Sequence, residues 1–185
     1  MIGARQSRSC QQEHCSRVAP AFSGGPSAAS RLERDVTGLS GVNAILWPEG
    51  INDLSKSGNV NAEAVEAGMK EIVMRARAKV PGLRIFAATL PSALHSTNAA
   101  HGSPEQDVQR KALNTFIMTS GVFDGVADFD KATLDPATGE MKAEFVPEST
   151  TGGPGDKLHP NRAGYLAMGM AIDLDLFKPA RRARR

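Results

Sequence analysis

The chain has 185 residues, of which 41% are hydrophobic and 23% charged. This is the composition of a soluble globular protein with enough residues for one domain and its core. The net charge of +2 is too small to indicate nucleic acid as a partner. No apolar stretch is long enough to span a membrane, and the N-terminus lacks the apolar region of a secretory signal.

The two ends of the chain differ from its middle. Residues 1–27 carry both cysteines, Cys10 and Cys15, but no apolar periodicity, which predicts an irregular arm. Two close cysteines define neither a disulfide framework nor a zinc site. Residues 179–185 form a basic tail. We therefore expect one folded domain over residues 28–178.

The first half of this domain predicts two helices and one strand. A short helix over 28–39 precedes an apolar strand over 42–47, which runs into a loop at 48–53. A long helix is expected over 61–79, because apolar residues recur there at helical spacing. They are Val65, Met69, Ile72, Val73, Ala76 and Val80.

The second half continues the alternation of strand and helix. We expect a strand over 83–90, a loop over 91–102, a strand over 122–129, a long loop over 130–158 and a helix over 160–176. Between the two strands, Ser103 is the expected N-cap of a helix, with Pro104 in its first turn and Gln106 reaching back. Its predicted core face consists of Ala112, Leu113, Phe116 and Ile117.

This alternation is typical of an α/β protein with a parallel sheet. Because crossover connections are right-handed, helices are expected on both faces, which gives three αβα layers. In such sheets, functional groups gather at the carboxyl ends of the strands.

A carboxylate and a histidine stand three positions apart in the late loop, as Asp156 and His159. The pair suits a hydrolase in which His159 is the general base and Asp156 orients its ring. Pro160 is a suitable first residue for the following helix. The alternative is a loop aspartate that caps the last helix beside an exposed histidine.

A second motif, Gly50-Ile51-Asn52-Asp53, follows the first predicted strand. An amide side chain at this place can donate a hydrogen bond to a developing oxyanion. The alternative is an Asn-Asp turn that leads into a helix. The nearby Trp47 fits packing better than function.

Together, the Gly50–Asp53 run and the phrase from Asp156 to Tyr165 resemble the SGNH (GDSL-type) hydrolase family. The resemblance implies a flavodoxin-like three-layer fold and a serine ester hydrolase that acts on small esters or acylated carbohydrates. It implies that His159 is the base, Asp156 its orienter and Asn52, in the loop that Gly50 turns, the oxyanion donor. The family mechanism uses no metal or organic cofactor.

The chain departs from the family pattern in its nucleophile. The Gly-Asp-Ser block that supplies the catalytic serine in the family is not in the sequence. Either the chain is an N-terminally truncated or frame-shifted product, or another serine has taken over. The candidates in the arm are Ser7, Ser9, Ser16 and Ser23, and Cys15 could act as a thiol nucleophile. The nucleophile stays unidentified.

Two other functions are open. Without the nucleophile strand, the strand over 42–47 has an open edge, which predicts a homo-oligomer. The chain could then be an inactive SGNH-like domain that acts as an oligomeric binding or scaffold protein. A metal site of His95, His101 and His159 is the weakest possibility, because their spacing matches no known ligand pattern.

Overall fold

The computed structural model describes residues 26–178. The predicted arm up to residue 25 and the basic tail lie outside the described residues. The same holds for Cys10 and Cys15 and for the candidate serines Ser7, Ser9, Ser16 and Ser23.

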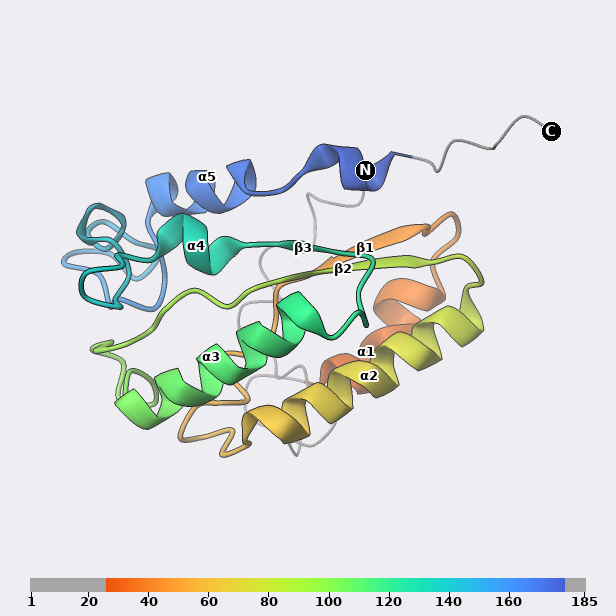
Figure 1. Ribbon diagram of the computed structural model, residues 1–185, viewed down its shortest axis with the longest axis horizontal. Helices are drawn as coiled ribbons and strands as arrows, with labels where there is room; N and C mark the ends of the chain where they lie inside the picture. The colour runs from red at the N-terminus through yellow and green to blue at the C-terminus, as the bar shows by residue number, and fades with distance from the viewer. Residues whose placement is uncertain (1–25, 179–185) are drawn as a thin grey trace.

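Three parallel strands form the centre of the fold, in the order β1-β2-β3 (Figure 1). They are β1 (Ala44–Trp47), β2 (Arg84–Ala88) and β3 (Gly125–Ala127). In the register, Trp47 lies opposite Ala87 and Ala88 lies opposite Ala127. The predicted α/β class, with a parallel sheet between two layers of helices, is confirmed.

The larger core lies between one face of the sheet and the helices α1 (Ala28–Leu32), α2 (Ala62–Lys79) and α3 (Pro104–Thr119). The predicted core positions of α2 are buried, apart from Val80, which is partly buried. From α3, Leu113, Phe116 and Ile117 are buried, but Ala112 is exposed. Asn114, which binds the end of β2, is buried in α3 as well.

The opposite face carries a much smaller core. It is covered by α4 (Phe129–Thr133) and α5 (Arg162–Met170), which pack against each other (Figure 1). Its buried cluster consists of Ala88, Ala127 and Phe129, with Leu46, Met168, Ala171 and Ile172 packed around it.

Several predicted boundaries are wrong for local reasons. The strand over 122–129 is shorter, because the Asp128 side chain accepts a hydrogen bond from Lys131 N and starts α4. The first helix continues past Leu32 as one π-helical turn, Glu33–Thr37. The long loop contains α4 and a 3₁₀ turn, Ala143–Phe145. The last helix ends at Met170, and Leu174–Phe177 is a separate 3₁₀ turn.

A buried polar network fixes the end of β2. Arg110 is 1% exposed and donates to the Leu90 carbonyl at 2.8 Å. Its guanidinium also pairs with Asp107 and Asp130, each at 2.8 Å. Asn114 receives a hydrogen bond from Leu90 N at 2.7 Å and returns one to the Leu90 carbonyl at 2.9 Å. The chain that leaves β2 is therefore held before its loop begins.

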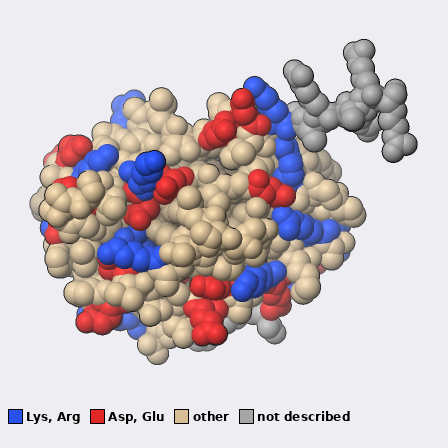
Figure 2. Space-filling model, in the orientation of Figure 1, with Lys and Arg blue, Asp and Glu red and all other residues tan. Residues whose placement is uncertain are grey.

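Charges of both signs are mixed on the surface shown in Figure 2, in agreement with the net charge of +2. Within residues 26–178, no helix is both long and apolar enough to cross a membrane.

The predicted capping box of α3 is confirmed and can be tested. Ser103 Oγ accepts from Gln106 N at 3.3 Å, and Gln106 Oε1 accepts from Ser103 N at 3.1 Å. Ser103→Ala should lower the free energy of unfolding by about 1 kcal/mol, measured by urea denaturation, because the N-cap bond is lost. Ser57→Ala, at an exposed turn position, is the control and should change it by less than about 0.5 kcal/mol. Equal effects of the two substitutions would refute the cap.

Candidate active site

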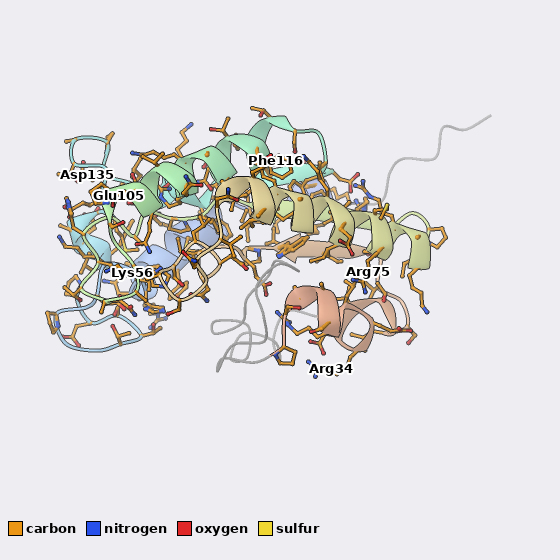
Figure 3. All side chains as sticks on the ribbon, turned by 90° about the horizontal axis from the view of Figure 1, so that it is seen from below. Arg34, Lys56, Arg75, Glu105, Phe116 and Asp135 are labelled. Atoms are coloured by element: carbon orange, nitrogen blue, oxygen red, sulfur yellow. The ribbon has the colours of Figure 1, made fainter. Side chains whose placement is uncertain are left out.

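The loops that follow the three strands gather at one end of the molecule. Figure 3 shows Lys56, Glu105 and Asp135, each C-terminal to a different strand, at that end, whereas Arg34 and Arg75 lie at the other. This is the carboxyl edge of the sheet, where α/β proteins place their sites. Both predicted motifs belong to these loops.

Asp156 and His159 form the pair that the sequence predicted. The ring nitrogen Nδ1 of His159 lies 2.7 Å from Oδ2 of Asp156. The other carboxylate oxygen, Oδ1, accepts hydrogen bonds from Leu158 N at 3.0 Å and His159 N at 2.9 Å. The Asp156 side chain is 13% exposed and the His159 side chain 30%, so the pair is largely shielded but still open to a small molecule.

The backbone around Asp156 takes conformations that only a special local sequence permits. Gly155 has φ +74°, and a Cβ there would overlap the carbonyl oxygen of Val146. Lys157 has φ +58°, a left-handed conformation that costs a non-glycine residue roughly 1 kcal/mol or more. This turn brings the amides of Leu158 and His159 onto one carboxylate oxygen.

The hydrogen bonds keep Asp156 ionised. Burial is the largest single influence and raises its pKa, but the His159 amide, the His159 ring and the Leu158 amide together outweigh burial. The net effect is a pKa below the usual value of an aspartate. An ionised carboxylate at Nδ1 stabilises the tautomer that carries its proton there and leaves Nε2 as the basic nitrogen.

The helix after His159 begins at Arg162, two residues later than the predicted start at Pro160. Asn161 is its N-cap, because its Oδ1 accepts from Ala163 N at 2.9 Å and Gly164 N at 3.1 Å. The Asn161 amide also donates to the carbonyls of Glu144 and Pro147. The cap therefore fixes α5 to the preceding loop and leaves His159 just outside the helix.

The loop over 89–102 connects the two predicted motifs. The carbonyl oxygen of Asp156 accepts from Ser96 Oγ at 2.6 Å and from Thr97 N at 3.1 Å. On its other side, the Ala100 carbonyl accepts from Lys56 N at 2.9 Å, in the loop that follows Asn52.

Gly50 and Asn52 lie at the end of β1, as predicted. Gly50 is buried with φ +130°, and a Cβ there would come within 3.2 Å of Leu113 Cδ2. The Asn52 carbonyl accepts from Ser55 Oγ at 2.6 Å, which closes the turn. In the described part of the chain, no hydrogen bond engages the Asn52 side-chain amide or joins it to the Asp156–His159 pair.

His101, which the sequence offered only as a metal ligand, lies half-buried on the loop over 89–102. Its charge interacts with those of His159 and Asp156. Burial lowers its pKa most, the charge of His159 lowers it further, and Asp156 acts in the opposite direction. Its position after β2, at the carboxyl edge, was the signal in the sequence for this interaction.

His95 pairs with a carboxylate outside the Asp156–His159 pair. Its Nδ1 lies 2.6 Å from Glu140 Oε1. Residues 26–178 contain no group of three or more His, Cys, Asp or Glu side chains placed to hold a metal ion.

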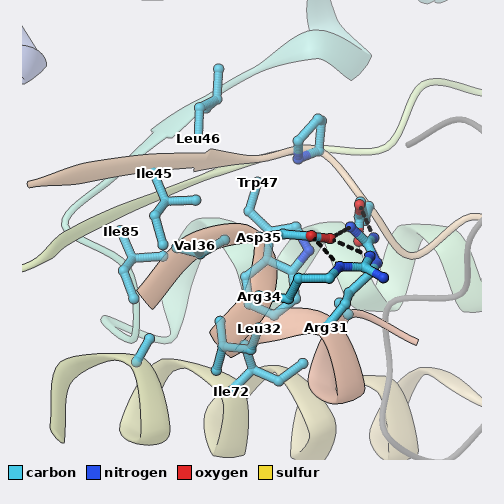
Figure 4. A pocket seen from close by; sticks show the side chains of 14 residues that line it. Arg31, Leu32, Arg34, Asp35, Val36, Ile45, Leu46, Trp47, Ile72 and Ile85 are labelled. Carbon is cyan, nitrogen blue, oxygen red and sulfur yellow. Dashed lines mark hydrogen bonds and ion pairs between the residues drawn. The ribbon is translucent and has the colours of Figure 1, made fainter. Parts of the chain in front are cut away.

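A groove of about 230 Å³ lies along β1, separate from these residues (Figure 4). Aliphatic side chains, among them Leu32, Ile45 and Ile85, line one part of it, and the ion pair between Arg31 and Glu49, at 3.0 Å, lines another. Trp47 also lines this groove, and its buried ring meets the ring of Phe123 edge-on.

A family model described as the GDSL-like lipase/acylhydrolase family matches residues 5–167. The chain therefore belongs to this family of ester hydrolases. No curated protein matches the sequence.

Solved structures share the fold at low sequence identity. A GDSL-like lipase from Bacteroides thetaiotaomicron is 16% identical over 80% of this chain, with a TM-score of 0.64. Est24, a carbohydrate acetylesterase from Sinorhizobium meliloti, is 11% identical over 86%, with a TM-score of 0.61. A carbohydrate esterase family 3 protein from Talaromyces cellulolyticus is 18% identical over 81%, with a TM-score of 0.54. The chain spans 68%, 71% and 66% of their respective lengths.

The lowered pKa of Asp156 predicts a pH-dependent stability. Because its folded pKa lies below the unfolded one, its contribution is complete above about pH 4 and is lost as the pH falls through the folded pKa. Asp156→Asn should lower the free energy of unfolding by about 2 kcal/mol at pH 7, the value of a charge-assisted hydrogen bond. The difference in the free energy of unfolding between Asp156→Asn and the wild type should become smaller below about pH 4.

Chemical denaturation at several pH values measures this effect. Asp175→Asn is the control, because the Asp175 side chain is 73% exposed and should show little difference at any pH. If Asp156→Asn differs from the wild type by the same free energy of unfolding from pH 7 to pH 3, the lowered pKa of Asp156 is wrong.

Proposed function

We propose that this protein is a serine ester hydrolase that acts on small esters or acylated carbohydrates. The observation that carries the proposal is the Asp156–His159 pair, at 2.7 Å, in a loop at the carboxyl edge of the sheet. Membership of the GDSL-like family supports it independently of this geometry.

Each residue has a separate role in this proposal. Nε2 of His159 takes the proton of the attacking hydroxyl and later gives it to the leaving alcohol. Asp156 holds the ring and stabilises the imidazolium that forms. Asn52 donates its side-chain N–H to the oxyanion, in the loop that Gly50 allows to turn after β1. No step requires a metal or an organic cofactor.

The nucleophile is the part of the proposal that has no residue assigned. Ser16 is the candidate nearest the site in the family pattern, and Cys15 is an alternative thiol; both lie outside the described residues. Acylation of such a group would be followed by attack of water on the acyl-enzyme.

Acetylated carbohydrates are the substrate class that the solved structures favour. Est24 is a carbohydrate acetylesterase and the Talaromyces protein is a carbohydrate esterase. Acetylated oligosaccharides and p-nitrophenyl acetate are therefore the first substrates to compare.

A second candidate is an inactive domain that associates through β1. Within residues 26–178, β1 is an edge strand of the three-stranded sheet, and the groove of about 230 Å³ lies beside it. A strand edge next to a groove with an aliphatic wall favours pairing with another chain. We propose that a second copy of this chain binds at the β1 edge and its groove. This association does not depend on catalysis.

Labelling with a fluorophosphonate probe, followed by peptide mapping, tests the hydrolase proposal. We expect one labelled serine in the wild type and loss of labelling in His159→Ala. Hydrolysis of p-nitrophenyl acetate should fall by about 100-fold or more in that variant, because the general base is gone. Glu144→Gln, at an exposed position, is the control and should keep full activity. A folded wild type that is neither labelled nor active would refute catalysis and leave the binding role.

Light scattering across a range of protein concentrations tests the association proposal. The wild type should be a dimer or larger. Val36→Lys, which adds a charge to the groove, should shift it towards monomer. Met74→Lys is the matched control, since Met74 is 64% exposed on α2 and outside the groove. A monodisperse wild-type monomer would rule the proposal out.

A further inference from the structure

We propose that Glu140 is a positioning residue that clamps the loop carrying the Asp156–His159 pair to the loop after β2. The inference rests on the proposed function, in which this pair is the catalytic relay. It concerns a residue outside both sequence motifs, on the turn that follows α4.

Glu140 joins two loops through its two carboxylate oxygens. Oε1 lies 2.6 Å from Nδ1 of His95, and Oε2 lies 2.7 Å from Nζ of Lys157. His95 belongs to the loop after β2, and Lys157 belongs to the loop that carries the relay. One side chain thus bridges segments that are 45 and 17 residues away in sequence.

The two partners of Glu140 are adjacent in sequence to Ser96 and Asp156, which form a second contact between the same loops. Ser96, next to His95, donates to the carbonyl of Asp156 at 2.6 Å, and Lys157 follows Asp156 directly. The clamp and the Ser96 hydrogen bond therefore hold the same two loops together at adjacent positions.

Both partners have left-handed backbones, with φ +57° at His95 and φ +58° at Lys157. Residues other than glycine keep this conformation only where the surroundings enforce it. The turn at Lys157 is also the turn that directs the amides of Leu158 and His159 to Asp156 Oδ1. Loss of the clamp would therefore release the turn that orients the relay.

Glu140 itself stands on a well-supported turn. Leu134 and Met141 form an antiparallel bridge, and Met141 is 3% exposed. Within the turn, Asp135 N donates to the Glu140 carbonyl at 2.9 Å. Ser92 Oγ donates to the Gly139 carbonyl at 2.7 Å, which ties the turn to the segment after β2.

The charges around Glu140 favour its ionised form. Lys157 lowers its pKa most, and His95 lowers it further. An ionised carboxylate between these two groups is the form that can bind both at once.

Hydrogen exchange measured by NMR on the full chain tests the clamp without relying on activity. In Glu140→Ala, the protection of the Leu158 and His159 amides should fall roughly fivefold or more, as expected for loss of a half-exposed ion pair that orders a turn. The hydrogen-bonded Nδ1 proton of His159 should exchange faster and broaden. The Ala87 amide, in the buried strand β2, should keep its protection and show that the fold is intact.

Matched variants separate positioning from a general effect of charge. Glu144→Ala removes an exposed glutamate four positions away and should leave all these signals unchanged. Lys157→Met removes the opposite charge and should lower the protection of the same amides. The double variant should show no lower protection than Glu140→Ala alone, because Glu140→Ala already breaks both contacts. If Glu140→Ala does not fold, the hydrogen exchange of Lys157→Met alone tests the clamp. Unchanged protection in Lys157→Met, or in a folded Glu140→Ala, would overturn the proposal.

Kinetics on p-nitrophenyl acetate give a second readout. Glu140→Ala should lower kcat with KM nearly unchanged, because the relay is misaligned while the substrate surface is kept. An inactive wild type would count against the hydrolase proposal only, since the exchange data still decide the clamp. An active Glu140→Ala with wild-type kcat would count against the clamp only.

Discussion

The site depends on one carboxylate that accepts three N–H groups. Asp156 binds the ring of His159 through one oxygen and the amides of Leu158 and His159 through the other. Because both amides come from the residues that immediately follow, the same bonds fold the turn and fix the tautomer of His159. The orientation of the imidazole and the local backbone structure are therefore not independent: a change that disturbs the turn also misorients the ring.

The loop after β2 transmits this geometry to the rest of the fold. Arg110 and Asn114 hold the Leu90 carbonyl at its start, and Ser96 and Thr97 bind the Asp156 carbonyl further along. Parallel strands end at one edge, so their loops must pack on one another, and the middle strand supplies the loop that touches both neighbours. This arrangement explains how a motif after β1 and another before α5 come to share one end of the molecule.

The sequence predicted the regular parts of the fold well and the long-range contacts poorly. The helix α2 and the capping box of α3 depend on periodicity and on side chains three residues apart, which a sequence displays directly. The Asp156–His159 pair was predictable for the same reason. The contacts of Glu140 with His95 and Lys157 depend on how loops pack, which no local pattern encodes. Ala112 was assigned to the core because alanine fits either side of a helix.

The two faces of the sheet differ in how firmly they are packed. The face under α1, α2 and α3 has a wide buried core, whereas α4 and α5 rest on a cluster of three buried residues. Elements with few buried apolar contacts open at lower free energy than the whole domain. His159 lies three residues before the first residue of the thinly packed helix α5. Mild denaturant or warming would thus free the Asp156–His159 pair in a partly opened state while the sheet and its thicker layer persist, so any activity that depends on the pair would be lost before the fold.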